Sequence, residues 1–89
     1  MNTYVIERGI EGIGESTPGD LQAISQKSAS VLGGMGPDIQ WVHSYVTSDK
    51  IFCVYRATSE ELVREHARLG GFPADSVCLV AATIDPTSV

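Results

Sequence analysis

The chain has 89 residues, which is enough for one small domain, and we predict a single domain over residues 1–89. Hydrophobic residues make up 43% of the sequence and charged residues 19%, as is typical of a globular rather than a disordered protein. The net charge is −5 and Lys and Arg do not cluster, which argues against nucleic acid as a partner.

The first residues, Met1–Arg8, carry neither the basic nor the apolar region of a secretory signal. No apolar run in the sequence approaches the length of a membrane span. We therefore expect a cytoplasmic protein without a membrane partner. In that compartment the two cysteines, Cys53 and Cys78, are expected to be reduced rather than bridged.

Strand and helix signals follow one another along the first part of the chain. Tyr4–Arg8 is rich in residues that favour strands, and glycines then mark a loop. Thr17, with proline next and Asp20 at the third helical position, predicts a helix start. Apolar residues recur at helical spacing up to the Gly33-Gly34 pair, where we expect the helix to end.

The stretch Trp41–Arg56 predicts two strands joined by a polar turn at residues 47–50. Thr58 as the cap and Glu61 as its partner predict a second helix that runs to Leu69. A last strand is expected over Ser76–Ile84.

The resulting order, β-α-β-β-α-β, predicts an α+β fold of the ferredoxin-like βαββαβ plait type. Right-handed crossovers then give a four-stranded antiparallel sheet with both helices on one face. Because the helices cover one face only, the side of the sheet on which each residue lies determines its role.

Alternation along the hairpin divides its residues into two sets. The set expected to face the helices is plainly apolar and consists of Val42, Val46, Phe52 and Val54. The set expected on the open face is Trp41, His43, Tyr45, Cys53 and Tyr55. An exposed patch this rich in aromatic residues favours a two-fold homodimer that packs sheet against sheet.

The same alternation places His43 next to Cys53 or Tyr55 across the hairpin. A nitrogen and a sulfur donor suit nickel, zinc or copper, although two ligands do not complete a shell. Alternatively, His43 is an interface histidine bonded to a tyrosine hydroxyl or a backbone carbonyl. His66 either interacts with the carbonyl end of its helix or binds an ion or small molecule near Glu65 or Asp75.

These residues do not readily form the active site of a nucleophilic enzyme. His43 and Cys53 are the one Cys–His pair that strand geometry brings together, and no orienting acid or oxyanion hole is evident. We therefore expect no catalytic residues, and the question of enzymatic activity stays open at this point.

Longer segments carry a family resemblance. The most specific are Trp41–Val46, Glu65–Arg68 and Gly70–Asp75. With these, nearly the whole chain resembles small bacterial domains of unknown function typified by a nickel-binding, nickel-responsive protein of actinomycetes. The resemblance implies a ferredoxin-like plait, a homodimer and Ni²⁺ binding, with His43, Cys53 and His66 as ligand candidates.

The leading hypothesis is thus a small cytoplasmic protein that binds nickel, or another divalent transition metal, for sequestration or metal response. The alternative is a dimeric enzyme or small-molecule-binding module that uses a cavity between the two sheets of the dimer. A purely structural dimer without a ligand is the third possibility.

Overall fold

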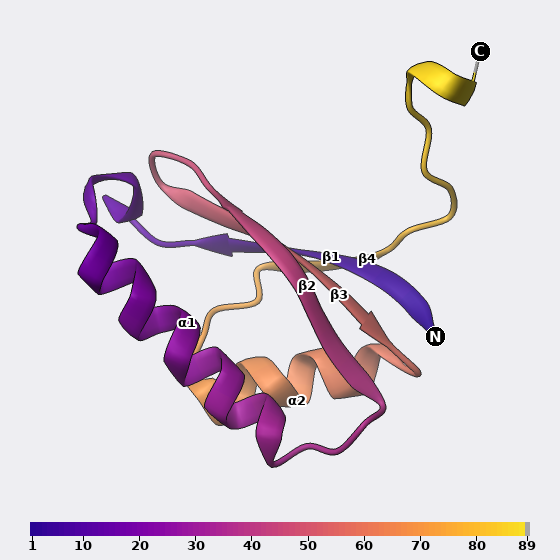
Figure 1. The fold of residues 1–89 in the computed structure, drawn as a ribbon, viewed down its shortest axis with the longest axis horizontal. Helices are drawn as coiled ribbons and strands as arrows, with labels where there is room; N and C mark the ends of the chain where they lie inside the picture. The colour runs from indigo at the N-terminus through magenta and orange to yellow at the C-terminus, as the bar shows by residue number, and fades with distance from the viewer. Residues whose placement is uncertain (89) are drawn as a thin grey trace.

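The computed structural model describes residues 1–88 and shows strands and helices in the predicted order (Figure 1). The elements are β1 (Asn2–Gly9), α1 (Pro18–Gly33), β2 (Ile39–Val46), β3 (Lys50–Ala57), α2 (Glu60–Gly70) and β4 (Ser76–Leu79). Short 3-10 helices cover Ile13–Glu15, before α1, and Pro86–Ser88, near the end of the chain.

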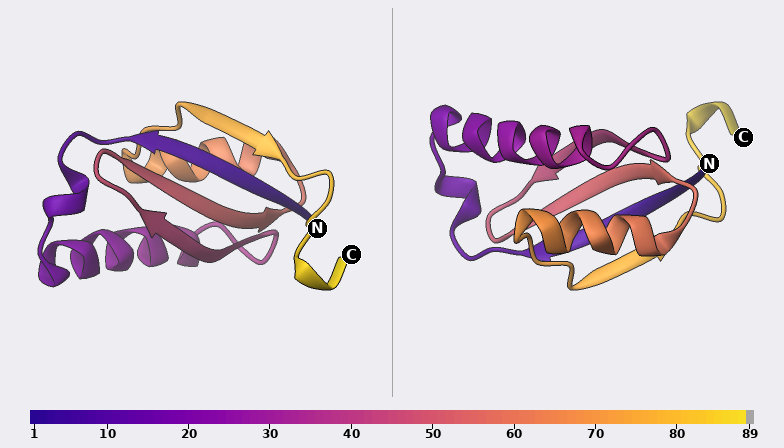
Figure 2. Two further views of the ribbon diagram at one scale, coloured as in Figure 1. Left: turned by 90° about the horizontal axis from the view of Figure 1, so that it is seen from above. Right: turned by 90° about the horizontal axis from the view of Figure 1, so that it is seen from below.

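The strands form one sheet in the order β2-β3-β1-β4, and neighbouring strands are antiparallel. Both helices lie on the same side of this sheet (Figure 2). The predicted ferredoxin-like α+β plait is therefore confirmed. Within residues 1–88, neither helix combines the length and the apolar character that crossing a membrane requires.

The start of α1 agrees with its sequence signal, whereas the start of α2 is shifted by one residue. The Thr17 hydroxyl and the Asp20 carboxylate each accept a backbone hydrogen bond, both of 3.1 Å, and so form a capping box. In α2, Ser59 replaces the predicted Thr58 as the cap and accepts from Leu62 N–H at 3.4 Å. Thr58 N–H instead donates to the Asp38 carbonyl, so it does not form the predicted reciprocal bond with Glu61.

The last strand is shorter than predicted. β4 ends at Leu79 instead of Ile84, and Val80 N–H still donates to the Thr3 carbonyl at 2.8 Å. Since β1 begins at Asn2, the residues after Val80 have no further length of strand to pair with. The following segment runs away from the body of the domain in Figure 1, and Ile84 is 84% exposed.

The face assignment for β3 was wrong. Cys53 and Tyr55, which we expected on the open face, are buried beneath the helices, together with Ile51. Phe52 and Val54 instead lie on the open face and are half-buried. Both sets are apolar enough to be buried, so alternation by itself did not distinguish them.

In β2 the assignment was correct for only part of the strand. A β-bulge between Trp41 and His43 changes the phase of the alternation. Trp41 is opposite Tyr55 and therefore lies on the helix side, which reverses the prediction for this residue. Val46 is opposite Ile51 and lies on the helix side as predicted. His43 and Tyr45, beyond the bulge, lie on the open face as expected (the Val42 side chain, within the bulge, is 48% exposed).

The core lies between the sheet and the helices, and the two helices contribute to it unequally. α2 buries Val63, His66 and Ala67. In α1 only Ser28 is buried, and the apolar residues Leu21 and Ile24 are half-buried. The predicted apolar stripe of α1 is thus incompletely covered, and space remains between this helix and the sheet.

Candidate functional site

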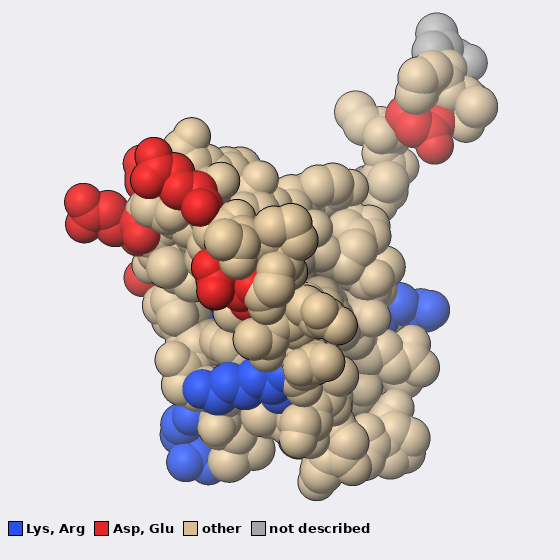
Figure 3. All heavy atoms as spheres, turned by 60° about the vertical axis from the view of Figure 1, so that its left-hand side comes forward, with Lys and Arg blue, Asp and Glu red and all other residues tan. Residues whose placement is uncertain are grey.

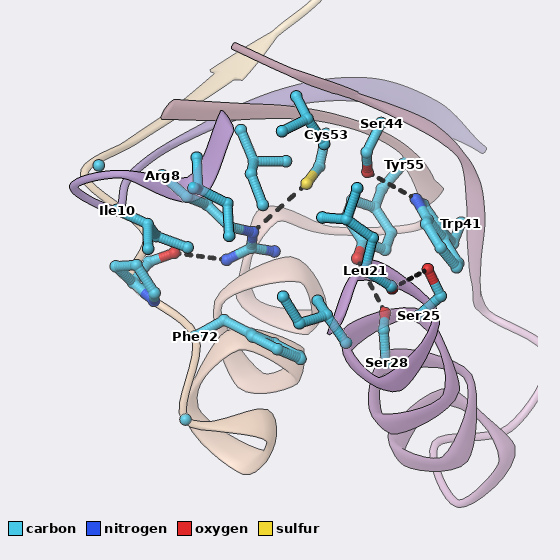
Figure 4. Close-up of a pocket in the computed structure, with 17 residues that line it drawn as sticks. Arg8, Ile10, Leu21, Ser25, Ser28, Trp41, Ser44, Cys53, Tyr55 and Phe72 are labelled. Atoms are coloured by element: carbon cyan, nitrogen blue, oxygen red, sulfur yellow. Dashed lines mark hydrogen bonds between the residues drawn. The ribbon is translucent and has the colours of Figure 1, made fainter. Parts of the chain in front are cut away.

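The space beneath α1 is a cavity of about 550 Å³ that we call the Arg8 cavity (Figure 4). Its volume is in the range of small-molecule sites in proteins. The apolar lining residues are Ile10, Ile13, Leu21, Ile24, Val46, Ile51 and Phe72. Gly9 and Gly71 line the cavity as well, and both are exposed, as is Val46, so the cavity opens to the surface.

The guanidinium of Arg8 is the charged group of this cavity. The side chain lies on the helix side of β1 and is 3% exposed. Its Nε donates to Cys53 Sγ at 3.4 Å, its Nη1 donates to the Pro73 carbonyl, and its Cζ lies 5.4 Å from the centre of the Phe72 ring. No carboxylate of the described residues lies within ion-pair distance of it.

The third nitrogen, Arg8 Nη2, is buried and has no hydrogen-bond partner among residues 1–88. In Figure 4 it points toward the interior of the group of lining residues. A buried cation with a free donor is costly, because it has lost its hydration without gaining a counter-ion. This arrangement suits an anion supplied from outside the chain.

Behind the cavity, three polar side chains from α1, β3 and α2 meet. Ser28 Oγ is 3.4 Å from Tyr55 Oη and 3.2 Å from His66 Nε2. The Tyr55 and His66 rings are 5.1 Å apart, and the His66 ring also lies 5.7 Å from Phe72. This cluster holds Tyr55 and Phe72, two lining residues, in place.

Burial determines the charge state of this cluster. It lowers the pKa of His66 below its ordinary value, and the nearby Arg8 charge lowers it further, against the effect of the Ser28 carbonyl. Burial likewise raises the pKa of Tyr55, although the bond to Ser28 opposes the shift. Both groups are therefore neutral near pH 7, and His66 Nδ1 has no partner in the described chain.

The structure does not bring the three predicted metal ligands together. His43 is exposed on the open face, where its ring contacts Tyr45 at 4.9 Å between centroids. Cys53 lies on the other face beside Arg8, and His66 is fully buried in α2. Within residues 1–88, no group of three or more His, Cys, Asp or Glu side chains is arranged to hold a metal ion.

The predicted pairing of His43 with Cys53 or Tyr55 is wrong because of the β-bulge. His43 is opposite Val54, and Cys53 is opposite Ser44. The guanidinium beside the Cys53 sulfur would also repel a divalent cation there. The Arg8 cavity lies on the helix side of the sheet within one chain, so it is a different cavity from the one expected between the two sheets of a dimer.

On the open face, register places His43 in one cross-strand row with Val54, Val5 and Cys78. His43 and Cys78 are therefore at opposite edges of the same face. Three strand spacings separate them, or roughly 14 Å, which is too far for one ion within a single chain.

Acidic side chains gather at one end of the face seen in Figure 3. Glu11, Glu15 and Asp49 line a shallow depression beside the β2–β3 turn. The Asp49 carboxylate accepts from Gly12 N–H at 2.9 Å, so it stabilises this loop.

Sequence reasoning missed Arg8, Ser28 and Phe72. The position of Arg8 could have been predicted, because residues two apart on a strand lie on the same face, and Arg8 follows the buried Tyr4 and Ile6 at this spacing. Nothing local indicated that Phe72, in the segment after α2, would lie against Arg8.

Together, the plait and its sheltered cavity define a small α+β domain with one covered and one open sheet face. A profile of the SCO4226-like family, described as nickel responsive protein SCO4226-like, matches residues 4–80 of the 89. The chain belongs to this family, in agreement with the resemblance seen in the sequence.

The fold is similar to that in the crystal structure of SCO4226 from Streptomyces coelicolor A3(2). The TM-score is 0.76 at 20% sequence identity, and the match covers 92% of this chain and 99% of that chain. No curated protein matches the sequence at a significant level.

Proposed function

We propose that this chain is a cytoplasmic protein that binds nickel and serves in sequestration or in a response to the metal. The observation that carries the proposal is family membership over residues 4–80, since the family is described as nickel responsive. Nickel accepts nitrogen, oxygen and sulfur donors, so other divalent transition metals are competitors for the same ligands.

The donor arrangement favours a site shared between two copies. The described part of one chain offers no group of three donors, whereas His43 and Cys78 are both exposed on the open face. That face also carries Tyr45, which is 60% exposed, and the half-buried Val54. We propose that the open faces of two copies pack together as a homodimer, which would cover these apolar groups.

A two-fold axis parallel to the strands would place β2 of one copy over β4 of the other. In such an isologous interface, His43 of each copy approaches Cys78 of the second copy. Backbone groups or carboxylates such as Glu7, which is on the same face, would complete the shell. Cys53 and His66, the other ligand candidates implied by the resemblance, lie on the helix side and belong in the same test.

The test is calorimetric titration of tag-free protein with Ni²⁺, because a histidine tag would supply false ligands. We expect His43→Ala and Cys78→Ser each to weaken binding at least tenfold, and Cys53→Ser and His66→Gln to leave it nearly unchanged. Cys53→Ser is the matched control for Cys78→Ser, since it removes the other thiol. Thermal unfolding of each variant identifies any loss caused by misfolding.

Affinity for nickel should also fall as the pH decreases below about 6.5, where a free histidine takes up a proton and no longer ligates. Sedimentation of the parent should give a mass near twice 9.5 kDa. A parent protein that takes up no nickel would refute the proposed function. Unchanged binding in all four variants would instead place the ligands elsewhere.

A further inference from the structure

We propose that the Arg8 cavity binds a small organic carboxylate with an apolar body. This site is separate from the open sheet face and does not depend on nickel. The inference rests on three properties of the cavity, namely the free guanidinium nitrogen, the apolar walls and the size.

The guanidinium determines the charge of the ligand. Arg8 is 3% exposed and has no ion-pair partner among the described side chains, and its Nη2 is unpartnered. Cys53 accepts from Nε and Pro73 accepts from Nη1. The donors that remain are those of Nη2 and the second hydrogen of Nη1, which lie next to each other on the guanidinium. A carboxylate is the planar anion that fits two adjacent guanidinium donors.

The immediate surroundings hold this guanidinium in one position. Nη1 is anchored to the Pro73 carbonyl, and the Phe72 ring lies against the group at 5.4 Å. Phe72 is in turn packed against His66, which is fully buried. A charged group held in this way loses little conformational freedom when it binds an anion, and this favours affinity.

The walls determine the rest of the ligand. Ile13, Leu21, Ile24 and Ile51 are among the side chains that face the cavity, and among residues 1–88 no second cationic side chain lines it. A ligand with two or more charges, such as a phosphate ester, would leave negative oxygens against these apolar side chains without partners. A ligand with a single charge and a hydrocarbon or aromatic body buries its apolar part there instead.

The size of the cavity agrees with a small organic molecule. Its volume of about 550 Å³ exceeds what an inorganic anion or a few water molecules need. Trp41 and Ser44 close one side of the cavity, where the indole Nε1 donates to Ser44 Oγ at 2.9 Å. Trp41 is the single tryptophan of the chain, so its fluorescence reports on occupancy of the cavity.

The experiment uses three probes with tag-free, full-length protein and a metal chelator, so that nickel plays no part. The probes are sodium octanoate, 1-octanol, which has the same chain without the charge, and inorganic phosphate, which has charge without an apolar body. Each is titrated while Trp41 emission is recorded, below the concentration at which octanoate forms micelles. We expect octanoate to bind at least tenfold more tightly than octanol, and phosphate not to compete with it.

Two variants and one control locate the site. Arg8→Met should weaken octanoate binding at least tenfold and leave octanol binding unchanged. Arg64→Met removes the same charge from an exposed position of α2, outside the cavity and the open sheet face, and should bind octanoate as the parent does. Ser25→Phe should fill the cavity from α1 and abolish binding of both ligands, with Arg8 left in place.

The proposal is overturned if octanoate and octanol bind the parent equally, if neither binds, or if phosphate displaces octanoate. It is also overturned if Arg8→Met, folded by its thermal unfolding curve, binds octanoate like the parent. If Arg8→Met does not fold, Ser25→Phe decides the question, because unchanged octanoate binding in that variant places the ligand elsewhere.

Discussion

Replacement of Arg8 by methionine should stabilise the ligand-free protein, although Arg8 makes several contacts. Methionine has a similar length and fills the same buried space without a charge. The prediction follows from the environment of the guanidinium, which is buried, lacks a counter-ion among residues 1–88 and leaves Nη2 without a partner.

The magnitude follows from opposing contributions. Loss of hydration costs several kcal/mol for a buried ion, and the unpartnered donor about 1–3 kcal/mol more. The charged hydrogen bond to the Pro73 carbonyl returns about 1.5–3 kcal/mol, the contact with Phe72 about 1–2 kcal/mol, and the weak bond to Cys53 Sγ about 0.5–1 kcal/mol. After an allowance for the Pro73 carbonyl left without its donor, we expect Arg8→Met to raise the free energy of unfolding by about 1–2 kcal/mol.

The assay is urea unfolding followed by circular dichroism, with thermal unfolding as a second measurement. For a domain of this size, a gain of this magnitude raises Tm by roughly 5–15 °C. Arg64→Met is the matched control, because it loses the same charge at an exposed position of α2, where a surface ion pair with Glu60 contributes little, and should change stability by less than about 0.5 kcal/mol. If Arg8→Met is less stable than this control by more than about 1 kcal/mol, the guanidinium is satisfied in the free protein and the reasoning fails.

Two further predictions concern the environment of α2. Because burial lowers the pKa of His66, the unfolded chain takes up a proton first as the pH falls through 6.5, so stability should decrease between about pH 7.5 and pH 5.5. Urea unfolding at both pH values measures this loss of unfolding free energy, which should be smaller in His66→Gln than in the parent and unchanged in His43→Gln. If the loss is equal in the two variants, His66 is not its cause. Gly70→Ala should destabilise the protein by about 1–3 kcal/mol, because its Cβ would lie 2.3 Å from the Phe72 ring. The control Gly33→Ala, whose Cβ meets nothing within 4 Å, should show little change in Tm, and equal Tm values for the two variants would contradict the packing argument.

Much of the fold could be predicted from local sequence patterns. The Thr17 and Asp20 capping box, the glycine pairs after each helix and the polar turn at residues 47–50 each act over a few residues. Such signals depend mainly on neighbouring atoms of the same segment, so most of them hold in the folded protein, although the cap of α2 is Ser59 instead of Thr58. With the rule for right-handed crossovers, they were sufficient to predict the plait.

The division of the hairpin between the two sheet faces required the tertiary structure. Alternation defines two sets of residues but does not say which set is covered when both are apolar. Tyr55 could be buried because Ser28, on α1, is near its hydroxyl. The β-bulge after Trp41 then separated His43 from Cys53, and no local residue pattern indicated it.

The site was the least predictable part, because its members come from distant segments. Arg8 and Phe72 are 64 positions apart, and only the packing of the segment after α2 against β1 brings them together. Local patterns in the sequence are enough to give the elements, their order and the alternation that puts Arg8 on the same face as Ile6. Whether that face is covered, and whether a counter-ion lies beside the guanidinium, depends on contacts between residues far apart in the chain, which no local pattern encodes.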